Sequence, residues 1–332
     1  MSSEQKRWPP HLRKLEPTRA WEVLSVREEA RPLPLGPLQQ PGRQPPGTVR
    51  FVCVSDTHST PPRQPLPAGD CLIHAGDFTD TGRPQEVEAF CAWLKAQPHA
   101  RKIVIAGNHD LTLDPESYPR THRRFGHKQP HDCAAARALI EGAAEYLHDS
   151  GTSVCGLQVW GSPWQPEFCG WAFNLRRGEA CAAKWRLIPT ATDVLITHGP
   201  PLGHGDLCQG GKRVGCLELL DAVTRRVRPT LHVFGHIHEG YGATTNGVTT
   251  FANASTCNVN YQPDNPPLVF DVPLPNPDLH LPSPDLHLHT PDRPAPPGCE
   301  GSGGEAVGGR FGGAHWYVAL VCCILVHWYV AY

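Results

Sequence analysis

The sequence has no charge imbalance and no C-x-x-C pair of cysteines, and each absence excludes a class of protein. Its 332 residues carry a formal net charge of −2, with a pI near 6.8. No overall field therefore attracts nucleic acid or an anionic membrane. Thirteen cysteines are present, but none has the C-x-x-C spacing that is typical of zinc and dithiol sites. We expect reduced, buried thiols and no nucleic-acid partner.

The N-terminus also lacks a feature, because its first ten residues contain no apolar stretch like that of a secretory signal. This predicts a cytoplasmic protein. The last 17 residues, 316–332, have no charge except a possible one on His327. As a helix they would reach roughly 25 Å, short of the ~20 residues that usually cross a bilayer. Two interpretations stay open: a buried or incidental tail, and a tail anchor that tethers the protein to a membrane.

Proline and glycine are abundant but unevenly distributed, and they divide the chain into four parts. Residues 1–47 are predicted to be a disordered N-terminal tail, and residues 48–272 a folded domain. Residues 273–314 form a Pro/Gly-rich linker in which Pro-x-Pro-Asp-Leu-His-Leu occurs twice, and residues 315–332 form a hydrophobic C-terminal tail. Tails and linkers of this composition cannot bury enough apolar surface to offset the entropy of ordering.

Within residues 48–272, short apolar runs alternate with segments of helical periodicity. The runs are bounded by glycine or polar residues, as expected of strands buried on both faces, and they lie at 49–54, 71–75, 103–106, 193–197 and 231–234. Helical spacing occurs at 83–97, 133–141, 178–187 and 217–227. The pattern predicts an α/β fold, a layered sandwich of two mixed sheets flanked by helices.

Potential metal ligands follow five of these strands. The motifs, in order, are D-x-H at 56–58, G-D at 76–77, G-N-H-D at 107–110, H-G at 198–199 and G-H-x-H at 235–238. Open α/β sheets bind ligands beyond the carboxyl ends of their strands, so we expect these side chains to converge. Carboxylate, amide and imidazole groups are ligands of divalent metal ions.

In this order, the five motifs resemble the calcineurin-like metallophosphoesterases over residues 49–272. The stretches 161–166, 197–201 and 235–242 look closer still to the vertebrate metallophosphoesterase-domain-containing proteins. The resemblance implies the same layered fold and two divalent metal ions, with Mn²⁺ the first choice and Fe, Zn, Co or Mg the alternatives.

The resemblance also implies roles for single residues. The metal ligands would be Asp56, His58, Asp77, Asn108, His198, His236 and His238, with Asp77 bridging the two ions. His109 would face the phosphate as proton donor or charge stabiliser, and Asp110 looks like the partner that orients the His109 ring. Arg213 lies between glycines. It is a candidate for binding the substrate phosphate, and the alternative is an ordinary charged side chain without that role.

Two divalent ions about 3.5–4 Å apart can clamp a phosphoryl group and generate hydroxide at neutral pH. We therefore expect a phosphoesterase that uses metal-bound hydroxide on a phosphodiester or phosphomonoester of a nucleotide-like small molecule. The alternative is a low-activity nucleotide-binding or interaction module that retains the fold.

Residues 118–132 contain four arginine or lysine residues. They are open to two interpretations, a phosphate-attracting lid and a solvated insertion.

Overall fold

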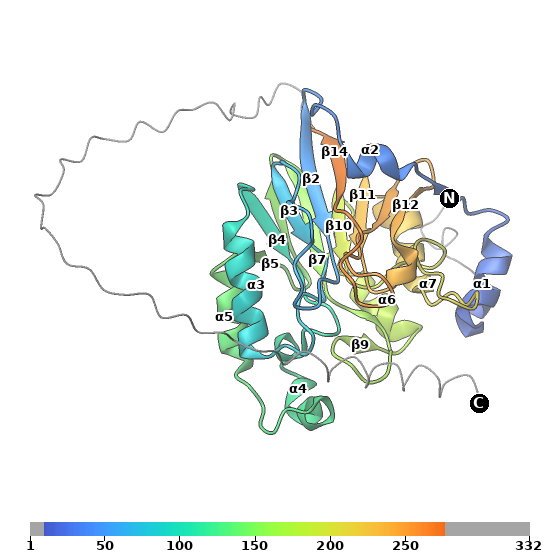
Figure 1. The fold of residues 1–332 in the computed structure, drawn as a ribbon. Helices are drawn as coiled ribbons and strands as arrows, with labels where there is room; N and C mark the ends of the chain where they lie inside the picture. The colour runs from blue at the N-terminus through green and yellow to red at the C-terminus, as the bar shows by residue number, and fades with distance from the viewer. Residues whose placement is uncertain (1–9, 276–332) are drawn as a thin grey trace, which may run out of the picture. The chain divides into compact units, whose positions relative to one another are not determined.

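A computed structural model of the chain describes residues 10–275, which form two mixed sheets flanked by helices (Figure 1). The α-helices are α1 (Pro17–Leu24), α2 (Leu35–Gln39), α3 (Pro84–Ala96), α4 (Tyr118–Thr121), α5 (Cys133–Glu141), α6 (Glu179–Trp185) and α7 (Leu217–Ala222). Shorter turns are η2 (Pro10–Lys14), η3 (Leu111–Leu113), η4 (His122–Phe125), the π-helical η5 (Val223–Val227) and η6 (His238–Gly240). The strands are β1 (Arg31–Pro32), β2 (Thr48–Val54), β3 (Cys71–His74), β4 (Arg101–Val104), β5 (Glu145–Tyr146), β6 (Ser150–Val154), β7 (Leu157–Ser162), β8 (Gln165–Pro166), β9 (Asn174–Leu175), β10 (Val194–Thr197), β11 (Leu231–Phe234), β12 (Gly242–Thr245), β13 (Thr250–Asn253) and β14 (Leu268–Pro273).

The two large sheets stack with helices outside them. One has the order β1-β12-β13-β11-β10-β7-β6 and the other β14-β2-β3-β4-β5. Each contains parallel and antiparallel pairs. Helices α3 and α5 cover the outer face of the five-stranded sheet, and α6 and α7 cover that of the seven-stranded sheet (Figure 1). The predicted α/β sandwich of two mixed sheets is confirmed.

Strand β2 shows how alternating side chains build two cores from one run. Phe51 and Cys53 lie in the core between the sheets. Val52 and Val54 point to the opposite face, where α3 packs on the sheet. Because both faces are buried, the strand is apolar throughout, as in other strands covered on both sides. Each fully buried side chain of this size stabilises the fold by about 1.5–3 kcal/mol.

The strand register brings the motif loops to one edge. Val54 of β2 pairs with His74 of β3, which pairs with Val104 of β4. The loops after these strands therefore begin side by side. An isolated bridge between Ser55 and Ser255 joins the end of β2 to the chain that follows β13, so the ends of the two sheets meet here.

Residues 10–47 are ordered, which corrects the prediction of a disordered tail over residues 1–47. Leu12, Ala20 and Leu24 are buried against three leucines of the segment 202–220. The prediction weighed how much proline the segment contains rather than where it lies. Pro17 stands in the first turn of α1, and Pro32 lies in the edge strand β1; both positions tolerate proline.

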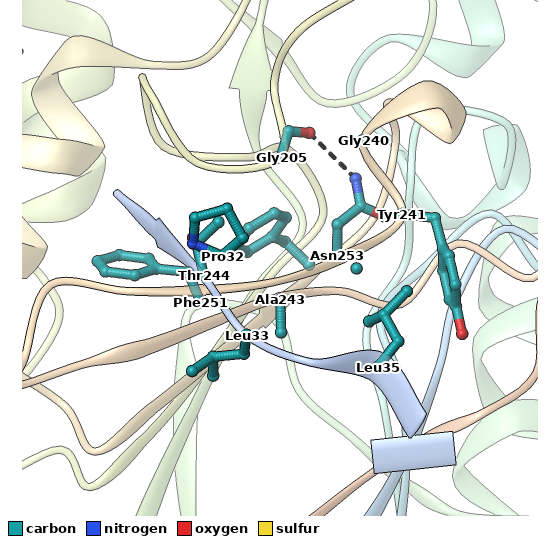
Figure 2. Close-up of a pocket in the computed structure, with 12 residues that line it drawn as sticks. Pro32, Leu33, Leu35, Gly205, Gly240, Tyr241, Ala243, Thr244, Phe251 and Asn253 are labelled. Atoms are coloured by element: carbon teal, nitrogen blue, oxygen red, sulfur yellow. Dashed lines mark hydrogen bonds between the residues drawn. The ribbon is translucent and has the colours of Figure 1, made fainter. Parts of the chain in front are cut away.

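The segment after α1 covers one edge of the larger sheet (Figure 2). Strand β1 pairs antiparallel with β12, and Leu33 N–H donates to a carbonyl of β12 at 2.9 Å. Leu33 and Leu35 line a cavity of ≈ 230 Å³ whose wall also includes Tyr241 and Asn253. The Asn253 amide donates to the Gly205 carbonyl at 3.1 Å, as the dashed line in Figure 2 marks. The N-terminal segment is thus part of the folded unit.

Two predictions concern residues that the structure does not describe. Residues 276–332, which hold most of the predicted linker and the hydrophobic tail, lie outside the described range. Within residues 10–275, no helix is long and apolar enough to cross a membrane. The linker and the tail anchor stay predictions.

Candidate metal centre

Four of the seven predicted ligands have a left-handed backbone. The φ angles are 51° at Asp56, 42° at His58, 54° at Asp77 and 68° at His236. Non-glycine residues seldom adopt this conformation, which costs on the order of 1–3 kcal/mol each. Local hydrogen bonds hold the turns: Asp56 N–H donates to the Gly76 carbonyl at 2.9 Å, and His58 N–H to the Asp77 carbonyl at 3.0 Å. These turns redirect the chain at the strand ends, so that the ligands face one another.

Asp56, His58 and His238 form the first group, with one ligand atom from each lying within 4.8 Å of the others. His238 Nε2 is 3.4 Å from Asp56 Oδ1 and 3.2 Å from His58 Nε2. Atoms bound about 2.1 Å from one ion lie roughly 3.0–3.4 Å from each other. The spacing therefore fits a shared cation. His58 Nδ1 is buried without a hydrogen-bond partner, which also fits a histidine whose position is set by ligation.

The second group contains Asp77, His198 and His236, and Asn108 lies beside it. His198 Nε2 is 3.2 Å from Asp77 Oδ2 and 3.0 Å from Asn108 Oδ1. These separations again match ligand atoms around one ion. The His236 ring lies edge-on to the His198 ring, with centroids 5.0 Å apart.

Asp77 faces both groups. Its Oδ2 lies 3.2 Å from His198 Nε2 and 4.0 Å from His58 Nε2. Its Oδ1 accepts the backbone N–H of His109 at 2.7 Å, which fixes the carboxylate plane. A carboxylate in this position can bridge two ions, as a two-metal site requires.

Backbone carbonyls and a serine orient the ligands, and the sequence analysis did not identify them. His198 Nδ1 donates to the Ala75 carbonyl and His238 Nδ1 to the Asn258 carbonyl, both at 2.9 Å. In each ring, Nε2 is thereby left with its lone pair toward the centre. The Ser255 hydroxyl donates to Asp56 Oδ2 at 3.0 Å. A carbonyl partner has no signature in a sequence, because every residue carries one.

The charges in the centre are strongly coupled. Burial lowers the pKa of His198, but the charge of Asp77 and its hydrogen bond outweigh burial and raise that pKa to about 9. The same competition, with Asp56 as partner, raises the pKa of His238. Burial lowers the pKa of His236 to about 3, helped by the charge of His198. The carboxylates thus favour the protonated forms of His198 and His238, and a divalent cation would compete with those protons for Nε2.

Two motif glycines are required by close approach to ligands. A Cβ on Gly235 would lie 1.9 Å from Asp56 Oδ2, and one on Gly107 would lie 2.3 Å from Asp77 Oδ1. Neither glycine has a positive φ, so space, not backbone conformation, excludes a side chain. The G-N-H-D and G-H-x-H motifs therefore need glycine where a carboxylate packs against the chain.

His109 lies beside the first group. One of its ring nitrogens is within 4.8 Å of the ligand atoms of His58 and Asp77. Its Nδ1 donates to the Asp80 carbonyl at 2.8 Å, and its ring stacks on Trp171 with centroids 4.0 Å apart. The ring is therefore fixed from two sides. The sequence analysis missed Trp171, since a lone aromatic between glycine and alanine gives no signal of its own.

Asp110 does not touch the His109 ring, which corrects the predicted orienting role. Its carboxylate is fully buried and accepts four hydrogen bonds: from the N–H of Asp77 (2.9 Å), Gly107 (2.8 Å) and Thr79 (3.0 Å), and from the Thr79 hydroxyl (2.7 Å). Burial, then the charge of Asp77, raises the pKa of Asp110 to about 8, and these donors oppose the rise. Asp110 instead ties together the two loops that carry Asp77 and Asn108.

Arg213 is not placed at the metal ligands, contrary to its candidacy as a phosphate-binding residue. Its guanidinium forms an ion pair with the buried Asp206 and lies 5.0 Å from the centre of the Trp21 ring. Its backbone N–H donates to the Thr18 hydroxyl at 3.0 Å. The flanking glycines suggested a phosphate loop, but the side chain instead fixes α1 to the loop before α7.

Comparison with known proteins places this geometry in a family. The sequence profile described as Calcineurin-like phosphoesterase matches residues 49–240. Metallophosphoesterase domain-containing protein 1 of Homo sapiens is 51% identical over 247 residues, covering 72% of this chain and 76% of that protein, and its Mus musculus counterpart matches equally. UPF0046 protein T07D4.2 of Caenorhabditis elegans is 42% identical over 276 residues, covering 78% and 68%. The chain belongs to the calcineurin-like phosphoesterase family.

Proposed function

We propose that the chain is a dinuclear metal-dependent phosphoesterase that hydrolyses a phosphodiester or phosphomonoester of a nucleotide-like small molecule. The position of Asp77 Oδ2 carries this proposal, because it lies 3.2 Å from a ligand atom of one group and 4.0 Å from one of the other. The ligands are imidazoles, carboxylates and one neutral amide. This set suits Mn²⁺, our first choice, and also Fe, Zn, Co or Mg.

Bound ions would polarise the phosphoryl group and supply hydroxide at neutral pH. The chain's own residues would position and exchange protons. Asp77 would keep the two ions together. His109 uses Nδ1 to donate to Asp80, so Nε2 is the nitrogen that would hold a proton for the leaving oxygen. Trp171 would keep the His109 ring in that orientation by stacking on it.

Aromatic side chains around the ligands support a substrate with a planar group. Tyr261, 42% exposed, has its ring 4.8 Å from that of His58. Phe168, 48% exposed, lies 5.8 Å from His236, and Trp171 stacks on His109. A nucleobase that stacks on such a ring gains about 1–3 kcal/mol. This favours a nucleotide-like ester over a small aliphatic one.

We also propose a cytoplasmic location and a small phosphate ester as the main partner. Ten cysteines in the described part of the chain are free thiols, as expected of a reducing compartment. The net charge of −2 gives no reason to expect nucleic acid. A membrane would be a partner only through residues 315–332, if they act as an anchor.

The proposal is tested by metal analysis and hydrolysis together. Purified protein should hold up to two divalent ions and should hydrolyse cyclic nucleotides or aryl phosphodiesters when Mn²⁺ is added. Asp77→Asn should lose both ions, since it removes the shared ligand. Two retained ions in that variant would exclude bridging by Asp77. Wild-type protein that binds two ions but turns over no ester would instead support the interaction module.

A further inference from the structure

A knob of two short helices beside the metal centre carries four cationic side chains. We name residues 118–128, comprising α4, η4 and the following turn, the basic knob. Its cations, all exposed, are Arg120, Arg123, Arg124 and Lys128. Among residues 10–275, none of these four side chains has an ion-pair or hydrogen-bond partner. The two aspartates that flank the knob are occupied, because Asp114 accepts the Ser117 and Phe173 N–H groups and Asp132 caps α5.

The basic knob is held in place by buried side chains at its base, while its four cations are exposed. Tyr118 is fully buried, and its hydroxyl forms a 2.7 Å hydrogen bond with His127 Nδ1. The same hydroxyl accepts the His131 N–H at 3.1 Å. His122 Nδ1 donates to the His127 carbonyl at 2.9 Å. The four cations thus stand on a fixed base.

This base is attached to both segments that hold the His109 ring. His127 Nε2 forms a 3.1 Å hydrogen bond with the Thr81 hydroxyl. Thr81 directly follows Asp80, whose carbonyl accepts from His109. On the other side, the Phe125 ring lies 4.5 Å from that of Trp171, which stacks on His109. Arg124 Nη1 is 2.6 Å from the place of a Cβ on Gly170, next to Trp171. The knob therefore borders the face of the centre that His109 presents.

A cluster of like charges without carboxylate partners favours binding of an anion. Like charges that are held near one another repel. An added anion would reverse the sign of this interaction. Arginine is suited to phosphate in particular, because its planar fork donates two parallel hydrogen bonds.

We propose that the basic knob binds a second anionic group of the substrate, so that the substrate class is phosphoesters that carry a further phosphate. This inference rests on the proposed function, since the metal centre would hold the ester that is cleaved. We favour the substrate over a macromolecule because the knob is fixed to the two segments around His109, and not to a remote surface.

The test uses two esters that differ by one phosphate. Ring opening of adenosine 2′,3′-cyclic phosphate is compared with that of its 5′-phosphorylated form, by chromatography, at fixed Mn²⁺ and low salt. Wild-type kcat/KM should be at least about tenfold higher for the 5′-phosphorylated ester, since one charged contact is worth about 1.5–3 kcal/mol and 1.4 kcal/mol is tenfold. Arg124→Ala should remove most of this preference.

Two variants control the experiment. Arg124→Lys should retain an intermediate preference, because it keeps the charge but loses the fork. Arg137→Ala removes an exposed arginine of α5 that pairs with Glu141 at 2.8 Å, and it should leave the preference unchanged. Arg123→Ala repeats the test at a neighbouring cation.

The outcomes separate this inference from the function on which it rests. No ring opening of either ester by wild type would refute the proposed function, and this inference with it. Equal kcat/KM for both esters, or a preference that survives Arg124→Ala and Arg123→Ala, would overturn the inference alone. Unchanged preference with loss of heparin binding in Arg124→Ala would assign the knob to an anionic macromolecule, and would overturn it as well.

Discussion

A single methyl group at Gly235 should disable one half of the metal centre. Gly235 does not have a positive φ, so alanine fits the backbone. The added Cβ, however, would lie 1.9 Å from Asp56 Oδ2 and 2.2 Å from Ser55 Oγ. An ordinary contact begins at 3.4 Å, so the Asp56 carboxylate must move by 3.4 − 1.9 = 1.5 Å. Metal–ligand distances tolerate only about ±0.2 Å.

The expected result is loss of the ion bound by Asp56, His58 and His238. The second ion keeps Asp77, Asn108, His198 and His236 and should remain. Metal content after dialysis should fall from two ions to one, and Mn²⁺-dependent hydrolysis should fall with it. Stability should drop by about 1–3 kcal/mol, the usual cost of overpacking a filled site. Urea unfolding measures this change as a lower midpoint at unchanged slope.

Gly42→Ala is the matched control, because a Cβ there meets nothing within 4 Å and its φ is not positive. It should change neither metal content nor stability beyond about 0.5 kcal/mol. If Gly235→Ala retained two ions with wild-type affinity, the close packing of Gly235 on Asp56 would not matter, and the assignment of Asp56 to the first ion would fail.

Three further variants test other parts of the structure. Leu24→Ala should lower the free energy of unfolding in urea by about 2–5 kcal/mol, because Leu24 is buried, whereas Val23→Ala, at an exposed position, should be neutral. Equal effects of the two variants would support the prediction of a disordered tail. Asp110→Ala leaves three buried N–H groups without an acceptor. It should lower the free energy of unfolding by about 1–3 kcal/mol for each unpaired group, and metal affinity should fall with it. Loss of turnover with an unchanged urea midpoint would instead support the predicted role of Asp110 in orienting the His109 ring. His236→Gly should weaken only the second ion, so its activity should partly recover as Mn²⁺ is raised; identical titrations for variant and wild type would contradict this.

The sequence predicted those features that repeat with a period or stand at a fixed place after a strand. The apolar runs at 49–54 and 71–75 became β2 and β3, because a strand buried on both faces has no polar positions. The seven predicted ligands lie within one cluster of loops, because parallel strands in register end at one edge. Both results follow from local patterns that any fold of this class must satisfy.

Hydrogen-bond and ion-pair partners that lie far apart in the sequence could not be predicted from it. Asp110 is adjacent to His109 in the chain, yet its carboxylate turns toward the N–H of Asp77, 33 positions away. Arg213 stands among glycines, yet its charge is used by the buried Asp206. In each case, desolvation decides the outcome: a buried charge must find its donors or its counter-ion, wherever the fold places them. Neighbours in sequence do not reveal that need.

The strain in the ligand loops connects metal binding to the stability of the fold. The four predicted ligands with positive φ cost together roughly 4–12 kcal/mol, comparable with the whole stability of a typical domain, about 5–15 kcal/mol. Part of this cost is offset by fixed hydrogen bonds, such as that from His236 N–H to Asp56 at 3.0 Å. Burial raises the pKa of Asp56, and repulsion from the charge of Asp77 adds to this, but the nearby His238 and His198 outweigh both and lower that pKa overall. A cation bound between Asp56 and Asp77 would remove their repulsion and would also offset the cost of the strained turns. The ligand loops and the ions should therefore stabilise each other as one cooperative unit.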